Sequence, residues 1–153
     1  MITEDRLHHI IGVARKAYKI AINMGYDETF AKKCFMLGWN HDIGYEFASS
    51  ENHATESAKM ILLLEDTINP SDLDKKSYLA IKYHSNYPND ITDEYKILTM
   101  ADMQVDSKGN ECDVIDRLND IKNRYGSTSN EYIISCDICF RLGLTNYNIS
   151  NIQ

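Results

Sequence analysis

The chain has 153 residues and a mass of 17.6 kDa, a size that fits one domain with one substantial core. Hydrophobic residues make up 43% of the sequence and charged residues 25%, which is ordinary for a globular protein and excludes disordered and fibrous chains. The net charge of −7 argues against a broad basic surface for nucleic acid. A small phosphorylated substrate stays compatible with this charge, because one pocket can be positive on an acidic protein.

The elements expected along the chain are all helices. Thr3 is a good N-cap for a first helix that ends at Gly25, and Asp27 caps a second helix that runs to His41. Further helices are expected over 51–65, over 71–84 with Ser71 as its N-cap, from Thr92 to about 101, over 112–125 and over 130–142. No segment alternates polar and apolar residues as a strand does. The expected fold class is therefore all-α, a single compact bundle of about six to eight helices.

Targeting signals and disulfides are not expected. No stretch approaches the roughly 18 consecutive apolar residues of a membrane span, and residues 1–6 lack the layout of a signal peptide. We therefore expect a cytoplasmic protein with no membrane contact and with reduced thiols. Cys136 and Cys139 have a zinc-like spacing, but structural zinc normally needs a second ligand pair, so packing is the expected role of both.

Histidine and aspartate residues carry the main chemical signal. The chain has five histidines, at positions 8, 9, 41, 53 and 84, and His41 is followed directly by Asp42. Imidazole is the commonest metal ligand in proteins, and carboxylate is its usual companion for divalent ions. Neighbouring helical residues project about 100° apart, so both side chains of this pair can reach one ion beyond the helix end. A buried Asp also needs a compensating charge, which a divalent ion supplies.

Three segments place this pair in a family context. Residues 6–14 (RLHHIIGVA), 35–45 (FMLGWNHDIGY) and 98–102 (LTMAD) resemble, in this order, the HD-superfamily phosphohydrolases. The resemblance covers roughly residues 6–103, the expected metal-binding core. It implies an HD-domain bundle in which helices over about 111–143 pack on that core, all within one domain over 1–153. Segments 101–110 and 117–126 resemble short bacterial HD proteins with no firmly assigned substrate.

The resemblance also implies the metal ligands. By this register they are His9, His41, Asp42 and Asp102, and His53 and His84 match the additional histidines of the dinuclear branch. The implied cofactor is a divalent metal, two ions of Mn, Fe, Co, Ni or Zn, with Mg also compatible. Three alternatives stay open for single residues. His8 could be the ligand in place of His9, and His53 could cap its helix or face solvent. His84 could interact only with the dipole at its helix C-terminus.

The implied activity is a metal-dependent phosphohydrolase that acts on a small phosphate ester, with a nucleotide as the expected class. His41, Asp42 and Asp102 are the expected catalytic residues, and Lys108, Arg117 and Arg124 are candidate phosphate contacts, although helical cations usually face solvent. No GYP motif follows the HD pair, which argues against a cyclic-di-GMP phosphodiesterase of the HD-GYP class. The alternatives are a catalytically silent module that binds metal and nucleotide, and an all-α interaction domain with a vestigial His/Asp set.

Overall fold

The computed structural model describes residues 2–46, 52–65 and 75–151, and this part of the chain is helical, without strands. The prediction of an all-α fold with six to eight helices is confirmed. Seven α-helices lie in the described ranges: α1 (Glu4–Asn23), α2 (Glu28–Asn40), α3 (His53–Glu65), α4 (Lys75–Lys82), α5 (Asp93–Asp102), α6 (Val114–Tyr125) and α7 (Asn130–Arg141). The same ranges contain the short 3-10 helices η1 (Ile43–Glu46) and η3 (Ile149–Asn151).

Side-chain caps set most helix starts. Thr3, Asp27 and Thr92 each accept a hydrogen bond from the backbone N–H three residues later, as the sequence predicted. Asp113 and Ser129 do the same for α6 and α7. The expected start near residue 112 was therefore slightly early, because the Asp113 carboxylate takes the N-cap position.

The helix over residues 75–82 ends two residues earlier than predicted. Its expected start at Ser71 lies outside the described residues, and α4 ends at Lys82. His84 thus follows the helix instead of belonging to it. Its backbone N–H still donates to the carbonyl of Ile81. Its side chain turns back to the same carbonyl through Nδ1, over 2.7 Å.

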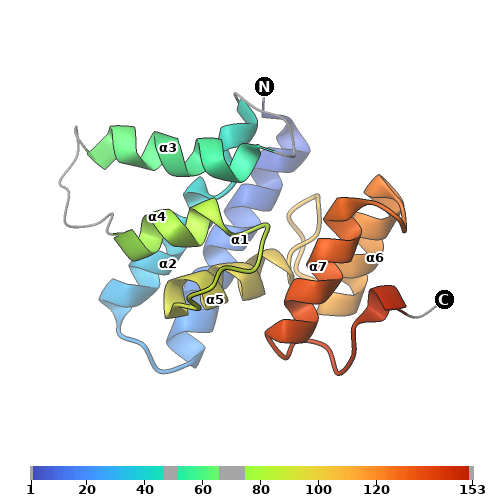
Figure 1. The fold of residues 1–153 in the computed structure, drawn as a ribbon. Coiled ribbons are helices and arrows are strands. Elements are labelled where there is room, and N and C mark those ends of the chain that lie inside the picture. Colours follow the sequence, from blue (N-terminus) through green and yellow to red (C-terminus); the bar gives the residue numbers. More distant parts are fainter. Residues whose placement is uncertain (1, 47–51, 66–74, 152–153) are drawn as a thin grey trace.

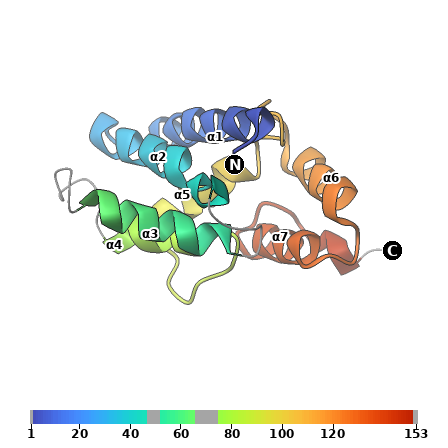
Figure 2. The same cartoon turned by 90° about the horizontal axis from the view of Figure 1, so that it is seen from above.

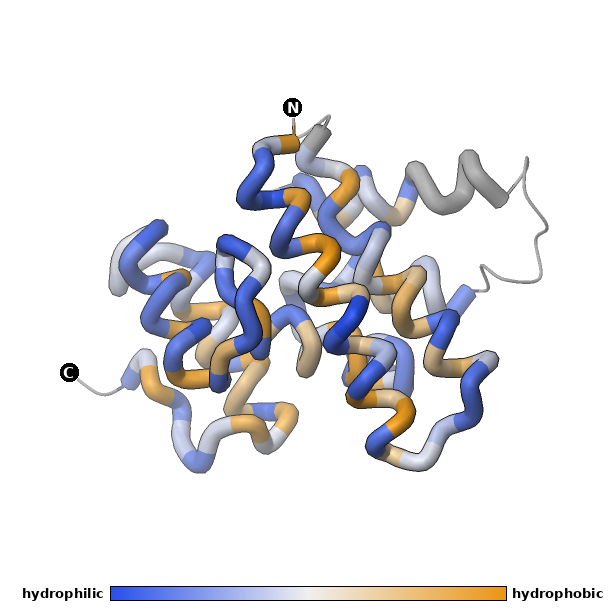
Figure 3. The backbone as a smooth tube through the Cα atoms, turned by 180° about the vertical axis from the view of Figure 1, so that it is seen from behind, coloured by the Kyte–Doolittle hydropathy of each residue, from blue (hydrophilic) through white to orange (hydrophobic). Residues whose placement is uncertain are grey.

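The apolar side chains form two clusters. One is shared by α1, α2, α3, α4 and α5, with Leu37 and Leu98 among its fully buried members. The other joins α6 and α7 with Met103 and the C-terminal segment. Figures 1 and 2 both show α6 and α7 side by side at one end of the molecule. Orange and blue residues alternate along α1 in Figure 3, as expected for a helix with one buried face.

Close packing of α1 on α2 depends on Gly38. A Cβ atom at this position would lie 2.6 Å from the Cα of Ala14, so a larger residue would push the two helices apart. The contact brings the N-terminal part of α1 beside the C-terminal end of α2. His9 and His41 consequently face each other, with ring centroids 5.6 Å apart.

Candidate metal centre

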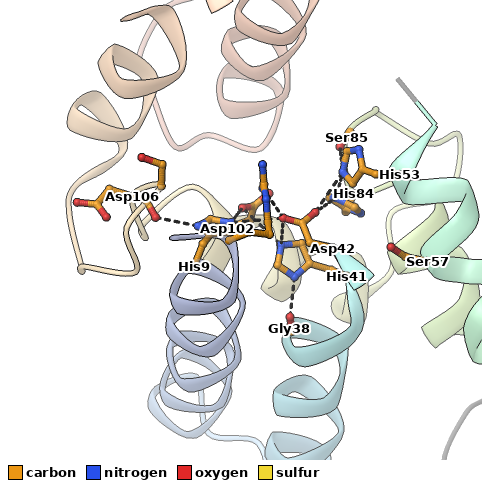
Figure 4. Close-up of polar contacts among 12 residues, drawn as sticks. His9, Gly38, His41, Asp42, His53, Ser57, His84, Ser85, Asp102 and Asp106 are labelled. Atoms are coloured by element: carbon orange, nitrogen blue, oxygen red, sulfur yellow. Dashed lines mark hydrogen bonds and ion pairs between the residues drawn. The ribbon is translucent and has the colours of Figure 1, made fainter. Parts of the chain in front are cut away.

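Six polar side chains from five parts of the chain converge at one point (Figure 4). They come from α1, the end of α2, the start of α3, the turn after α4 and the end of α5. They are His9, His41, Asp42, His53, His84 and Asp102. The sequence analysis predicted these six residues as metal ligands, and the structure brings all of them together.

The two oxygens of Asp42 face different histidines. Oδ1 lies 3.2 Å from Nε2 of His53 and 3.3 Å from Nε2 of His84. Oδ2 lies 3.4 Å from Nε2 of His41 and 3.8 Å from Nε2 of His9. Asp42 is 3% exposed. Its carboxylate stands between two histidine pairs, His53 with His84 and His9 with His41. This is the arrangement of a carboxylate that can bridge two ions.

Asp102 closes the half of the cluster that contains His9 and His41. Its Oδ1 lies 2.9 Å from Nε2 of His9 and 3.8 Å from Nε2 of His41. Because Asp102 is the last residue of α5, its side chain projects beyond the helix end into the cluster. His9, His41 and Asp102 form one compact group of candidate ligand atoms, and His41, Asp42 and His84 form another.

Backbone carbonyls fix the orientation of three of the imidazoles. A carbonyl can only accept, so each ring nitrogen that contacts one must carry the hydrogen. The Nδ1 atom is the donor in every case, over 2.6–2.8 Å, so Nε2 points into the cluster and, in the neutral ring, carries a lone pair there. The pairs are His9 with Asp106, His41 with Gly38, and His84 with Ile81.

Mutual charge effects hold the cluster in an ionised state. Burial favours the neutral forms, but the charge of His41 and the close contacts with His53 and His84 outweigh it and hold the pKa of the Asp42 carboxyl well below its usual range. Burial likewise disfavours a charged His41, yet the Asp42 and Asp102 carboxylates raise the pKa of His41 to about 9. In the metal-free protein, the protonated His41 ring and the Arg6 guanidinium therefore supply the positive charge that the two carboxylates require.

The donor atoms fit divalent metal. Within the described part of the chain, the buried Nε2 of His41 has no hydrogen-bond partner. The nearest carboxylate oxygens lie 3.4 and 3.8 Å from it, so an ion that takes the place of its proton would give this nitrogen a direct partner. The Nε2 atoms of His53 and His84 are 2.9 Å apart. Two nitrogens bound at right angles to one ion, at about 2.1 Å each, are separated by about 3 Å. Nitrogen and carboxylate donors without thiolate suit Mn, Fe, Co, Ni or Zn.

A cavity of about 610 Å³ lies over the cluster. Asp42, His53, His84 and Asp102 line one side of it. The opposite wall comes from α6, α7 and the turn between them, and it includes Arg124, Tyr125, Asn130, Glu131 and Ser135. The volume falls within the range of small-molecule sites.

The candidate phosphate contacts separate in the structure. Arg117 and Arg124 line the cavity, whereas Lys108 is exposed in the loop after α5 and does not line it. His8 is exposed and His9 is 1% exposed, so His9 is the histidine of α1 that faces the cluster. His53 is also buried, so the exposed alternative for it is wrong, and His84 is buried with its Nε2 facing Asp42.

Arg6 and Tyr45 are cavity residues that the sequence reasoning missed. Nη1 of Arg6 donates to Oδ2 of Asp42 over 2.8 Å. The Tyr45 ring stacks on His53, with centroids 4.2 Å apart, and the Arg6 guanidinium lies 3.9 Å from the centre of the same ring. Two groups this close must occupy opposite faces of Tyr45. A signal existed for Arg6, since it precedes His9 by three residues and thus shares its face of α1.

The cysteine pair serves packing. Cys136 and Cys139 are both buried in the second apolar cluster, and burial raises the pKa of both thiols, that of Cys139 to about 12. Neither belongs to a group of candidate metal ligands among the described residues.

No helix in the described ranges is long and apolar enough to cross a bilayer.

Comparison with known proteins identifies one family. The model of the HD domain matches residues 6–103, which is more than half of the chain and includes all six residues of the cluster. No curated protein and no solved structure shows a significant match. The matched region ends just after Asp102, so α6 and α7 lie outside it.

Proposed function

The chain belongs to the HD domain family, whose superfamily is that of metal-dependent phosphohydrolases, and we propose that this protein hydrolyses a small phosphate ester, with a nucleotide as the substrate class. The observation that carries the proposal is the position of the cluster. Histidine and aspartate ligands lie in the wall of a cavity that also holds the cations of Arg6 and Arg124. Ligands and phosphate-binding groups thus face the same space.

We propose that the centre is dinuclear. Six candidate ligands are more than one catalytic ion needs, because such an ion keeps a position for water or substrate. Asp42 would be shared, with His9, His41 and Asp102 on one side and His53 and His84 on the other. The division of Asp42 between two histidine pairs supports this assignment.

The bound metal supplies a water of lowered pKa, which is a nucleophile at neutral pH without a strong base. The residues of the chain provide the rest. The backbone carbonyls behind His9, His41 and His84 keep their Nε2 atoms directed inward. Arg6 and Arg124 neutralise a phosphate in the cavity, and the buried walls reduce the solvent around it.

The cavity favours an ester larger than phosphate itself. Its wall includes the aromatic ring of Tyr125, the amides of Asn86 and Asn130, and the carboxylate of Glu131. A ring can stack on a base, and amides and a carboxylate can bind its polar edge. A nucleoside monophosphate, a cyclic nucleotide or a dinucleoside polyphosphate offers such a base.

The test combines metal analysis with a substrate screen. Purified protein is loaded with Mn²⁺, its metal content is measured, and hydrolysis of p-nitrophenyl phosphate and of nucleotides is assayed. We expect bound metal and turnover in the wild type, and in His41→Ala a loss of turnover and a lower metal content while the far-UV circular dichroism stays helical. Metal without turnover would support the silent binding module instead, and neither metal nor turnover would leave only an interaction domain.

A further inference from the structure

Arg117 connects α6 to the candidate metal centre. Its side chain is 9% exposed, which is unusual for arginine. Nε donates to the backbone carbonyl of Asp102 over 3.2 Å, and Nη2 lies 3.6 Å from Oδ1 of the same residue. That oxygen is also the one that faces His9 and His41. One guanidinium therefore contacts both the main chain and the carboxylate of a candidate ligand.

The position of Asp102 explains why such a partner is useful. As the last residue of α5, Asp102 has a backbone carbonyl with no partner inside the helix. A cation at a helix C-terminus satisfies that carbonyl and interacts favourably with the helix dipole. Arg117 does this and at the same time restricts the rotation of the carboxylate.

Arg117 is itself held by a third contact. Nη1 donates to Oδ2 of Asp120 over 2.9 Å, one turn further along α6. Asp120 also accepts from the backbone N–H of Ser107 over 3.0 Å and from its hydroxyl over 3.3 Å. Ser107 follows Asp106, whose carbonyl orients His9. The network thus supports two candidate ligands, Asp102 directly and His9 through the loop.

We propose that Arg117 is a positioning residue that fixes Asp102 for metal binding, a role that rests on the proposed function. Nε and Nη1 donate hydrogen bonds within the fold and Nη2 faces the Asp102 carboxylate, so we assign Arg117 to Asp102 and not to the substrate phosphate. The consequence is that α6, outside the region matched by the HD domain, completes one half of the metal centre. A lysine cannot reproduce this, because one ammonium lacks the planar fork that reaches three acceptors.

The test measures metal affinity and rate in Arg117→Met, Arg117→Lys and a matched control. Arg141→Met is the control, since Arg141 also pairs with an Asp on its own helix but does not line the cavity. Mn²⁺ binding is followed by paramagnetic resonance, and Co²⁺ binding by its visible absorption spectrum. Circular dichroism and thermal melting show that each variant is folded.

We expect Arg117→Met to lower the affinity for one of the bound ions by about 10- to 100-fold, as loss of a residue that orients a metal ligand usually does. Its Co²⁺ spectrum should change, kcat should fall, KM should stay within about twofold, and Arg117→Lys should recover part of the affinity. Wild-type metal affinity in a folded Arg117→Met variant would overturn the proposal. So would a change confined to KM, which would make Arg117 a phosphate contact. If the wild type bound no metal, the proposed function would fail first, and the two failures are therefore distinguishable.

Discussion

Replacing Asp42 with Asn keeps the shape of the side chain and removes its charge. The carboxylate presents Oδ1 to His53 and His84 and Oδ2 to His41 and His9. An amide offers a single oxygen, so it cannot serve both halves of the cluster. We expect Asp42→Asn to reduce bound Mn²⁺ from about two ions per chain to one or none, and to lower the rate of hydrolysis.

The magnitude follows from the contacts of Asp42. Loss of an outer partner of a metal ligand costs about 10- to 100-fold, so loss of a ligand shared by two ions should exceed 100-fold in kcat/KM. Without metal, the variant leaves Arg6 without its carboxylate. Breaking a buried ion pair costs roughly 3–5 kcal/mol, and because Arg6 is 15% exposed we expect the lower end, about 3 kcal/mol.

The stability difference has a defined pH dependence. Because the pKa of Asp42 is held well below its ordinary value in the folded protein, its charged form stabilises the fold at neutral pH. This contribution disappears as the pH falls through the folded-state pKa. The metal-free wild type and Asp42→Asn should therefore differ in urea unfolding at pH 7 and converge in acid.

The assay needs metal counts by mass spectrometry, steady-state kinetics and urea unfolding on one set of preparations. Asp137→Asn is the matched control, because Asp137 is 38% exposed and forms only an exposed pair with Arg141 in the same helix. The control should behave as wild type. The reasoning is refuted if Asp42→Asn binds two ions and keeps more than a few per cent of the activity.

Three further outcomes are expected. His53→Ala and His84→Ala should each lower the metal count from about two toward one, and an unchanged count in both would reduce the centre to one ion. Because the pKa of metal-free His41 is about 9, metal uptake at pH 7 should release a proton, seen as a buffer-dependent heat in titration calorimetry; a heat independent of the buffer would contradict this. Arg6 and the metal compete for Oδ2 of Asp42, so Arg6→Met should bind Mn²⁺ about tenfold more tightly, because the metal no longer displaces a charge-assisted hydrogen bond worth about 1.5 kcal/mol. Unchanged or weaker Mn²⁺ binding would contradict this competition.

Local signals in the sequence predicted the helices well. A cap needs only one side chain and the N–H three residues later, so Thr3, Asp27 and Thr92 could be recognised without tertiary information. The choice of His9 over His8 likewise followed from register, because only one of two adjacent residues can lie on the buried face of α1. The sequence placed all six cluster residues through their order within the family pattern.

The contacts around the cluster could not be predicted in this way. Arg117 reaches Asp102 only because α6 packs beside the end of α5, and no local pattern sets that angle. Lys108 and Arg124 are both cations on polar segments, yet only Arg124 lines the cavity. Cations of similar local character thus receive different roles from tertiary packing, which a helix pattern does not encode.

The central claim is that this cluster binds divalent ions on both sides of Asp42. Its most direct test is anomalous X-ray diffraction from crystals soaked in Mn²⁺, recorded at the manganese absorption edge. We expect two peaks roughly 3.5–4 Å apart, one near His9, His41 and Asp102 and the other near His53 and His84. Absence of any anomalous peak within bonding distance of Asp42 in fully soaked crystals would contradict the account.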